Sequence, residues 1–176
     1  MHLMLDLETL STRHDAVIAS IGACLFEPRE DSILGTFHHA VALASQPSRH
    51  IAGDTVAWWL QQSSKAQQSI LIDATPLTHV LNRFNRWVCA QHITTIWANS
   101  PSFDVVILRH AFQELGLTWP FKFWQERDVR TAKDLAFPNG DAPANDATDI
   151  KHNALDDAVF QAHLIQLCHA RISNRT

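Results

Sequence analysis

The chain has 176 residues, of which 46% are hydrophobic and 18% are charged, and its formal net charge at pH 7 is −4. This length and apolar content predict one compact domain with a sizeable core and exclude a disordered chain. The charge excludes a protein that coats nucleic acid through a broad basic surface, because such binding needs many Lys and Arg contacts to phosphate.

The first 43 residues are predicted to form β-structure. Aliphatic residues dominate 2–7 and 17–26, and the polar segment between them indicates two strands joined as a hairpin. A third apolar run, 33–43, follows the polar turn at 28–31. The chain is therefore expected to open with a three-stranded meander.

Helical patterns begin near residue 54. Asp54 or Thr55 can cap a short helix, and a second short helix is predicted over 64–71. Pro76 then starts an amphipathic helix, whose apolar residues recur at a spacing of 3.6: Leu77, Val80, Leu81, Phe84, Trp87 and Val88. This apolar face can serve either the core or an interface.

The remaining elements alternate between strand, helix and loop. A strand is predicted over 94–98, followed by a helix over 101–115 that Gly116 closes and a helix over 129–136. Residues 138–149 are rich in Pro, Asn and Gly and predict a loop, and a last helix runs from about 153 to about 171. This order predicts an α/β fold, with a mixed sheet flanked by helices.

The N-terminal segment is not expected to act as an export signal. It reads MHLMLDLE, with two carboxylates inside the stretch that a signal peptide keeps apolar, and no apolar run of 18 residues follows. Cys24, Cys89 and Cys168 lie far apart in apolar segments. We therefore expect a soluble, cytoplasmic protein with three reduced cysteines in its core.

Asp6 and Glu8 form the first candidate site. They lie two residues apart in an otherwise aliphatic strand, so their side chains project from the same face. Two carboxylates at this distance suit Mg²⁺ or Mn²⁺. The alternative is an exposed strand face that carries charge, since Asp-x-Glu alone is a weak motif.

Asp104 is the second candidate. Its neighbours at +3, +4 and +7 in the predicted helix are Ile107, Leu108 and Ala111, so the carboxylate is expected on or beside the buried face, where it needs a partner such as a metal ion. Alternatively, Asp104 is a residue of the first helical turn that the helix dipole favours.

The third candidate is the segment that opens the last helix. A histidine can act as a general base at neutral pH, so His152 can take a proton from water, and a carboxylate that follows can hold the metal that acidifies this water. Asp157 shares its helical face with apolar residues, whereas Asp156 shares its side with polar ones, so Asp157 is the expected ligand. The alternative is that these residues only favour a helix start.

The three segments together resemble the exonuclease motifs of the His-bearing branch of the DEDD superfamily. The motifs are Asp-x-Glu-Thr in the first strand, Asn-x-x-x-Phe-Asp at 99–104 and His-x-Ala-Leu-x-Asp-Ala at 152–158. The segments at 55–59, Trp97 and 127–131 resemble those of the ribonuclease T-like subgroup, which contains phage and bacterial 3′–5′ exonucleases. The likeness extends from residue 3 to about 168.

The resemblance implies a ribonuclease H-like fold with a five-stranded mixed sheet, and it implies roles for five residues. Asp6, Glu8, Asp104 and Asp157 would bind two divalent cations, Mg²⁺ or Mn²⁺, and His152 would be the general base of a two-metal hydrolysis that releases nucleoside 5′-monophosphates. Thr9, Leu10 and Trp59 are candidates for holding the terminal nucleotide, Trp59 having a core role as its alternative. Phe103 is assigned to the core.

The implied substrate is the 3′ end of a nucleic acid, expected to be single-stranded, with DNA favoured over RNA. Relatives often form homodimers, so a homodimer is an open alternative to a monomer, and no membrane partner is expected. A rival hypothesis is a non-catalytic module that binds nucleic acid or protein on the same fold. The presence of all five residue types argues against this loss of chemistry. A third hypothesis is another metallohydrolase or a transferase that uses the same carboxylates.

Overall fold

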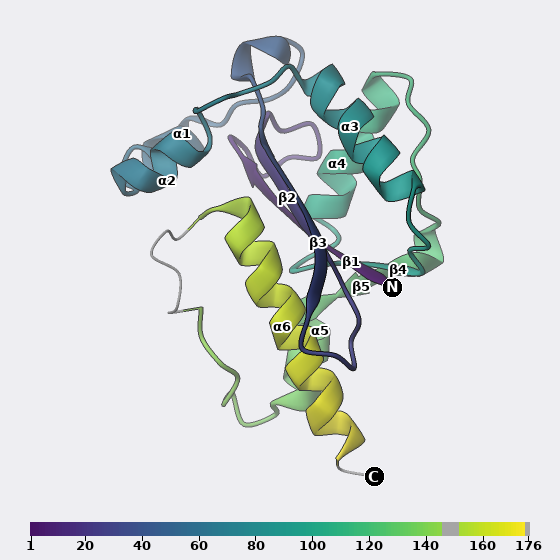
Figure 1. Cartoon of the computed structure of the whole chain (residues 1–176). Coiled ribbons are helices and arrows are strands. Elements are labelled where there is room, and N and C mark those ends of the chain that lie inside the picture. The colour runs from purple at the N-terminus through teal and green to yellow at the C-terminus, as the bar shows by residue number, and fades with distance from the viewer. Residues whose placement is uncertain (146–151, 175–176) are drawn as a thin grey trace.

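A computed structural model describes residues 1–145 and 152–174 of the chain (Figure 1). The expected loop over 138–149 is therefore described only as far as residue 145. Within the described residues, no helix is long and apolar enough to cross a membrane.

A five-stranded mixed sheet forms the centre of the fold, as the resemblance implied. Its strands are β1 (His2–Thr9), β2 (Ile18–Phe26), β3 (Ile33–Ala40), β4 (Thr95–Ala98) and β5 (Glu126–Asp128). The spatial order is β3-β2-β1-β4-β5. Strands β1, β2 and β3 pair antiparallel, whereas β4 runs parallel to both β1 and β5. The predicted meander is thus confirmed.

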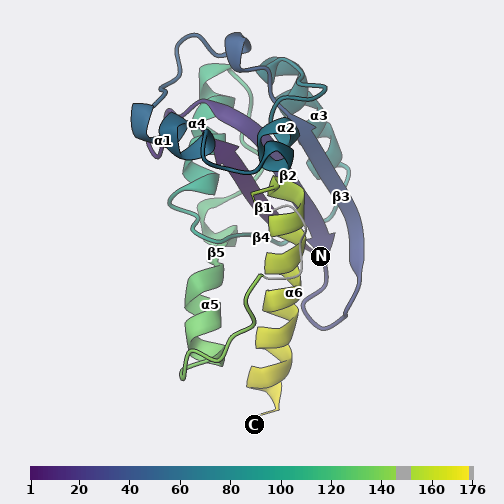
Figure 2. The ribbon, with the colours of Figure 1, turned by 90° about the vertical axis from the view of Figure 1, so that its left-hand side faces the viewer.

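Helices cover both faces of this sheet (Figures 1 and 2). They are α1 (Gly53–Trp59), α2 (Ser64–Ser69), α3 (Leu77–Cys89), α4 (Asp104–Glu114), α5 (Val129–Ala136) and α6 (Ala154–Ser173), with 3₁₀ turns η1 (Leu43–Ser45) and η2 (Phe123–Gln125). On one face, Leu3, Leu5 and Leu7 of β1 pack against α3 and α4. On the other, Met4 packs in a cluster with residues of α5 and α6.

The structure corrects three sequence predictions. The third apolar run forms a strand only as far as Ala40 and then enters η1. Helix α1 begins at Gly53 without a side-chain cap, because the N–H of Ala52 donates to the carbonyl oxygen of Leu10 and fixes the entry to the helix. Helix α4 begins at Asp104 rather than at residue 101, since the chain makes a turn first.

The cysteine prediction is correct for two of the three residues. All three are free, and Cys24 and Cys168 are buried in the core between the sheet and α6. Cys89 is exposed, because it is the last residue of α3 and lies outside the buried stripe of that helix. An apolar neighbourhood in the sequence therefore did not imply burial.

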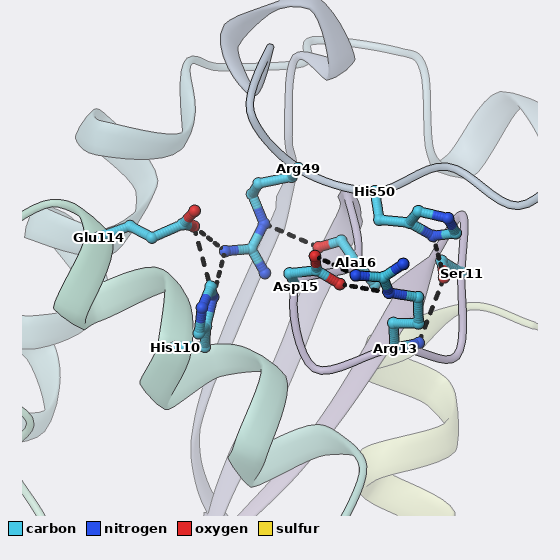
Figure 3. A network of polar contacts seen from close by, with 8 residues as sticks. All are labelled: Ser11, Arg13, Asp15, Ala16, Arg49, His50, His110 and Glu114. Carbon is cyan, nitrogen blue, oxygen red and sulfur yellow. Dashed lines mark hydrogen bonds and ion pairs between the residues drawn. The ribbon is translucent and has the colours of Figure 1, made fainter.

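A polar network fixes the segment that follows β1 (Figure 3). The guanidinium of Arg49, a buried residue, donates to the carbonyl oxygen of Ala16 at 2.7 Å and pairs with Glu114 of α4. The hydroxyl of Ser11 lies 2.7 Å from Nδ1 of His50. These contacts join the β1–β2 connection to the segment before α1.

Candidate active site

Asp6 and Glu8 project from β1 toward the face that α6 covers, together with Met4. The alternate residues Leu3, Leu5 and Leu7 face the opposite core, as the two-residue period of a strand requires. Glu8 is buried, and Asp6 is half-buried. The expected pairing of these two carboxylates on one face is present.

Asp104 reaches the same strand from α4. Beyond the last β1–β4 pair, Leu5 with Ala98, the backbone N–H of Leu7 donates to Oδ1 of Asp104 at 3.0 Å. Asp104 is 4% exposed and is the first residue of its helix. Both properties that the sequence suggested, burial and a helix N-terminal position, hold for this residue.

Asp157 is carried by the first turn of α6. Asn153 caps this helix, because its side-chain oxygen accepts hydrogen bonds from the N–H groups of Leu155 and Asp156. The carboxylate of Asp157 accepts a hydrogen bond of 2.7 Å from Asn145. The position of Asp157 is thus fixed by the capped start of α6, and the orientation of its carboxylate is fixed by Asn145.

His152 lies immediately before this cap, with a φ of 65°. Its ring makes an edge contact with the ring of Trp58 at 4.7 Å between centroids. One ligand-type atom from each of Glu8, His152 and Asp157 lies within 4.8 Å of the other two. Residues some 145 positions apart in the sequence therefore meet at one point.

These five residues line one cleft of about 570 Å³. Its other walls come from the turn before α4, from α5, from the loop around Asn145 and from α6. The lining includes two cationic residues of α5, Arg130 and Lys133. The cleft is therefore acidic at its floor and basic along one wall.

The carboxylates of the cleft repel one another in the absence of a cation. Burial raises the pKa of Glu8 to about 8, and the charges of Asp157 and Asp104 add to this rise. Burial, followed by the charges of Asp104, Glu8 and Asp157, also raises the pKa of Asp6 well above its ordinary value. The pKa of Asp104 is raised by burial to about 7.

The donor set fits a divalent cation. Oxygen ligands from carboxylates are those that Mg²⁺ and Mn²⁺ prefer. Burial raises the pKa of all four carboxylates, and mutual repulsion adds to the rise for Asp6 and Glu8, so a cation would stabilise their charged forms. Asp6, Glu8, Asp104 and Asp157 are the residues that could hold such ions. His152 lies beside Glu8 and Asp157 and can accept a proton there.

Two amide side chains that the sequence analysis did not single out support this cluster. Gln161 of α6 donates from Nε2 to Oδ1 of Asp6 at 2.7 Å, and Asn145 holds Asp157 as described above. Gln161 is four residues after Asp157, so it lies on the same face of α6. That spacing is the one feature of the sequence that could have indicated a role for Gln161 at the site. No local sequence pattern indicates the role of Asn145.

A second cavity of about 370 Å³ adjoins the cleft. It shares Leu7, Glu8 and Phe103 with the cleft and is otherwise lined by Thr9, Thr12, Asp54, Thr55, Trp58 and Trp59. Phe103 is half-buried and borders both spaces, so its assignment to the core alone was incomplete. Thr9 therefore borders the space that lies next to Glu8.

The other two candidates for holding a nucleotide lie deeper. Leu10 is buried in a small apolar cluster with Val17 and Trp59 and does not line either cavity. Trp59 is 5% exposed and donates from its indole nitrogen to the carbonyl oxygen of Thr9 at 3.0 Å, whereas Trp58 is 40% exposed. The more accessible tryptophan at this cavity is thus Trp58.

The chain is similar in sequence to known nucleases. A family model described as the 3′–5′ exoribonuclease Rv2179c-like domain matches residues 1–169. An exodeoxyribonuclease of Enterobacteria phage T4 is 22% identical over 201 residues, which cover 93% of this chain and 88% of the relative.

Solved structures share the fold at low sequence identity. Cell-death related nuclease 4 matches 98% of this chain with a TM-score of 0.64 and 16% identity, and the match spans 63% of that nuclease. The nuclease domain of 3′hExo, a DEDDh family member solved with bound rAMP, matches 98% of this chain with a TM-score of 0.59 and 12% identity, over 91% of its own length. The fold is thus ribonuclease H-like.

Proposed function

The chain belongs to the family of 3′–5′ exoribonuclease Rv2179c-like domains, and we propose that it removes nucleotides from the 3′ end of a nucleic acid by metal-dependent hydrolysis. One observation carries this proposal: Glu8, His152 and Asp157 meet within 4.8 Å in the cleft that Asp6 and Asp104 also line. The proposed products are a nucleoside 5′-monophosphate and a strand one nucleotide shorter.

The reaction adds one water molecule across the terminal phosphodiester bond. The oxygen of water forms a new bond to phosphorus, the bond between phosphorus and the 3′ oxygen breaks, and that oxygen takes up a proton. Two divalent cations, Mg²⁺ or Mn²⁺, would acidify the water and neutralise charge on the phosphate when bound to the four carboxylates.

His152 is the proposed general base. It lies beside two of the proposed cation ligands, and its contact with Trp58 limits the orientations of its ring. Asp104 is held by the Leu7 N–H, Asp6 by Gln161 and Asp157 by Asn145, so these three of the four carboxylates keep a defined orientation before substrate arrives.

The proposed substrate is a single strand, with DNA as the first candidate. The phage T4 relative is named an exodeoxyribonuclease, whereas the family is named for an exoribonuclease and 3′hExo was solved with rAMP. The adjoining cavity at Thr9 and Trp58 is the proposed place of the terminal nucleoside. Discrimination at the 2′ position would arise there.

End-labelled DNA and RNA strands of the same sequence, each single-stranded and as duplex, test this proposal directly. With Mg²⁺ or Mn²⁺, we expect a ladder of strands that shorten from the 3′ end, and EDTA should abolish it. Asp6→Asn should abolish shortening, and His152→Ala should reduce its rate roughly 10²- to 10⁴-fold.

Asp31→Asn, in the exposed turn between β2 and β3, is the matched control and should retain the full rate. Binding of an intact strand without shortening would instead support the alternative of a non-catalytic module. Undiminished rates in Asp6→Asn and His152→Ala would refute the assignment of the site.

A further inference from the structure

Two cationic residues of α5 face the acidic cleft. Arg130 and Lys133 lie three residues apart, on one face of the helix, and both line the cleft that contains Asp6, Glu8 and Asp104. Arg130 is exposed, and Lys133 is half-buried. Arg130 is close enough to Asp104 for its charge to lower the pKa of that carboxyl, against the larger effect of burial.

These two side chains differ from the four arginines that are paired in the described part of the chain. Arg13, Arg49, Arg109 and Arg171 each form an ion pair with a carboxylate. Within residues 1–145 and 152–174, Arg130 and Lys133 make neither an ion pair nor a side-chain hydrogen bond, although four carboxylates line the same cleft. Two cations on the wall of a cleft that pair with none of the described residues are suited to an anionic ligand.

The shape of the site places that anion relative to the reacting bond. The cleft and the adjoining cavity meet at Leu7, Glu8 and Phe103, beside His152 and Asp157. A strand whose scissile phosphate lies at this junction has its terminal nucleoside in the smaller cavity, which hydroxyl and indole groups line. The rest of the strand then leaves through the larger cleft, along α5.

We propose that Arg130 and Lys133 form a subsite for the phosphate on the 5′ side of the penultimate nucleotide. This inference rests on the proposed exonuclease function and adds a substrate requirement to it. The enzyme would recognise two consecutive phosphates, one at the carboxylates and one at α5. A dinucleotide with a 5′-phosphate would be the shortest substrate that fills the site.

A comparison of two dinucleotide substrates isolates the effect of this phosphate from that of the scissile one. The 5′-phosphorylated pTpT carries it, whereas TpT has the same scissile bond and lacks it. We expect kcat/KM of the wild-type protein to be roughly 10- to 100-fold higher for pTpT than for TpT, because charge-assisted hydrogen bonds to a phosphate stabilise a complex by that factor. The measurement is the disappearance of the dinucleotide with Mg²⁺ or Mn²⁺, because pTpT yields two molecules of thymidine 5′-monophosphate whereas TpT yields one and thymidine. The corresponding RNA dinucleotides are measured in parallel.

Variants assign the preference to α5. Arg130→Ala and Lys133→Ala should each lower the ratio of kcat/KM for pTpT to that for TpT about tenfold, mainly through KM, and the double variant should bring it close to one. Arg130→Lys should recover part of the ratio. Arg86→Ala, an exposed residue of α3 that lines neither cavity, is the matched control and should keep the wild-type ratio.

Equal kcat/KM for pTpT and TpT, in a wild-type protein that still shortens long strands, would overturn the subsite and leave the exonuclease proposal intact. Losses of the same size on both dinucleotides in Arg130→Ala and Lys133→Ala would also overturn it, because a structural defect does not distinguish the substrates. No shortening of any strand would overturn the exonuclease proposal itself. Unchanged melting temperatures verify that the variants fold.

Discussion

Gly22 of β2 lies directly against the backbone of Ala154 at the start of α6. A methyl group in place of its hydrogen would be 2.0 Å from the carbonyl carbon of Ala154 and 2.3 Å from the nitrogen of Leu155. Gly22 also pairs with Asp6 in the β1–β2 ladder. The missing side chain therefore permits the approach of α6 that brings Asp157 to the carboxylates of β1.

Gly22→Ala should separate α6 from the sheet at the site. Because the clashing atoms belong to the backbone and cannot rotate away, we expect a loss of stability of at least about 1–3 kcal/mol, which is the usual cost of overpacking. We also expect a loss of exonuclease rate of more than tenfold, measured on long strands. Thermal melting measures the first effect.

Gly35→Ala is the control for the glycine substitution. Gly35 lies in β3 of the same sheet, and an added methyl group would meet only Cδ1 of Leu25, at the ordinary distance of 3.5 Å. This variant should keep both activity and stability. A Gly22→Ala protein with the wild-type rate would show that the close approach of α6 is not needed.

Gln161 should tune the cation site through Asp6. Replacing Gln161 by Ala removes the hydrogen bond of 2.7 Å to Oδ1 of Asp6 and frees that carboxylate to rotate. Removal of a residue that orients a metal ligand typically lowers metal affinity or activity 10- to 100-fold. We expect a higher Mg²⁺ concentration at half-maximal rate, and titration of the rate with Mg²⁺ measures it.

Gln166→Ala provides a comparison on the same helix. Gln166 is also buried, but its amide donates to the carbonyl oxygens of Glu27 and Ser32, away from the cleft. Its replacement should lower the melting temperature without changing the Mg²⁺ dependence. If both variants shifted the Mg²⁺ dependence equally, Gln161 would have no specific role.

The two adjacent tryptophans should have separate roles. Trp59→Phe removes the hydrogen bond to the carbonyl oxygen of Thr9 and should cost about 1 kcal/mol of stability with little change in rate. Trp58→Ala removes an exposed ring that contacts His152 beside the second cavity and should lower kcat/KM about tenfold with little change in stability. Denaturation and strand-shortening assays on both proteins separate these effects, and a reversed pattern would contradict them.

The long apolar elements and the order of the motifs were readable from the sequence because each is a local pattern. The stripe of α3, the boundaries of α5 and the antiparallel meander follow directly from hydrophobic spacing. Strand β5 was not predicted from local pattern, since Glu126, Arg127 and Asp128 carry no apolar alternation and become a strand only by pairing with β4 at the edge of the sheet.

The supporting parts of the site depend on contacts between distant segments. The spacing around Asp104 predicted its burial, but its hydrogen bond to Leu7 requires β1 to extend beyond the end of β4. The φ of 65° at His152 and the contact of Asn145 with Asp157 arise from the path of the chain into α6. No periodicity encodes such contacts.

Glu8 should make the stability of the metal-free protein depend on pH. Its pKa is raised from 4.5 to about 8 on folding, so the folded protein holds the proton of Glu8 more tightly than the unfolded chain does. The contribution of Glu8 to the free energy of unfolding is therefore fully present below pH 4.5 and is lost as the pH rises toward 8. In EDTA, Glu8→Gln should therefore melt above the wild type, by a margin that grows from pH 5 to pH 8. Each unit of pKa difference is worth about 1.4 kcal/mol, so a margin on the order of 2–4 kcal/mol is expected at pH 8.

Mg²⁺ or Mn²⁺ should raise the wild-type melting temperature more than that of Glu8→Gln. Glu30→Gln, in the exposed β2–β3 turn, is the control and should melt like the wild type at each pH. If the melting temperatures of the wild type and Glu8→Gln differed by the same amount at every pH from 5 to 8, the stability would not depend on the ionisation of Glu8.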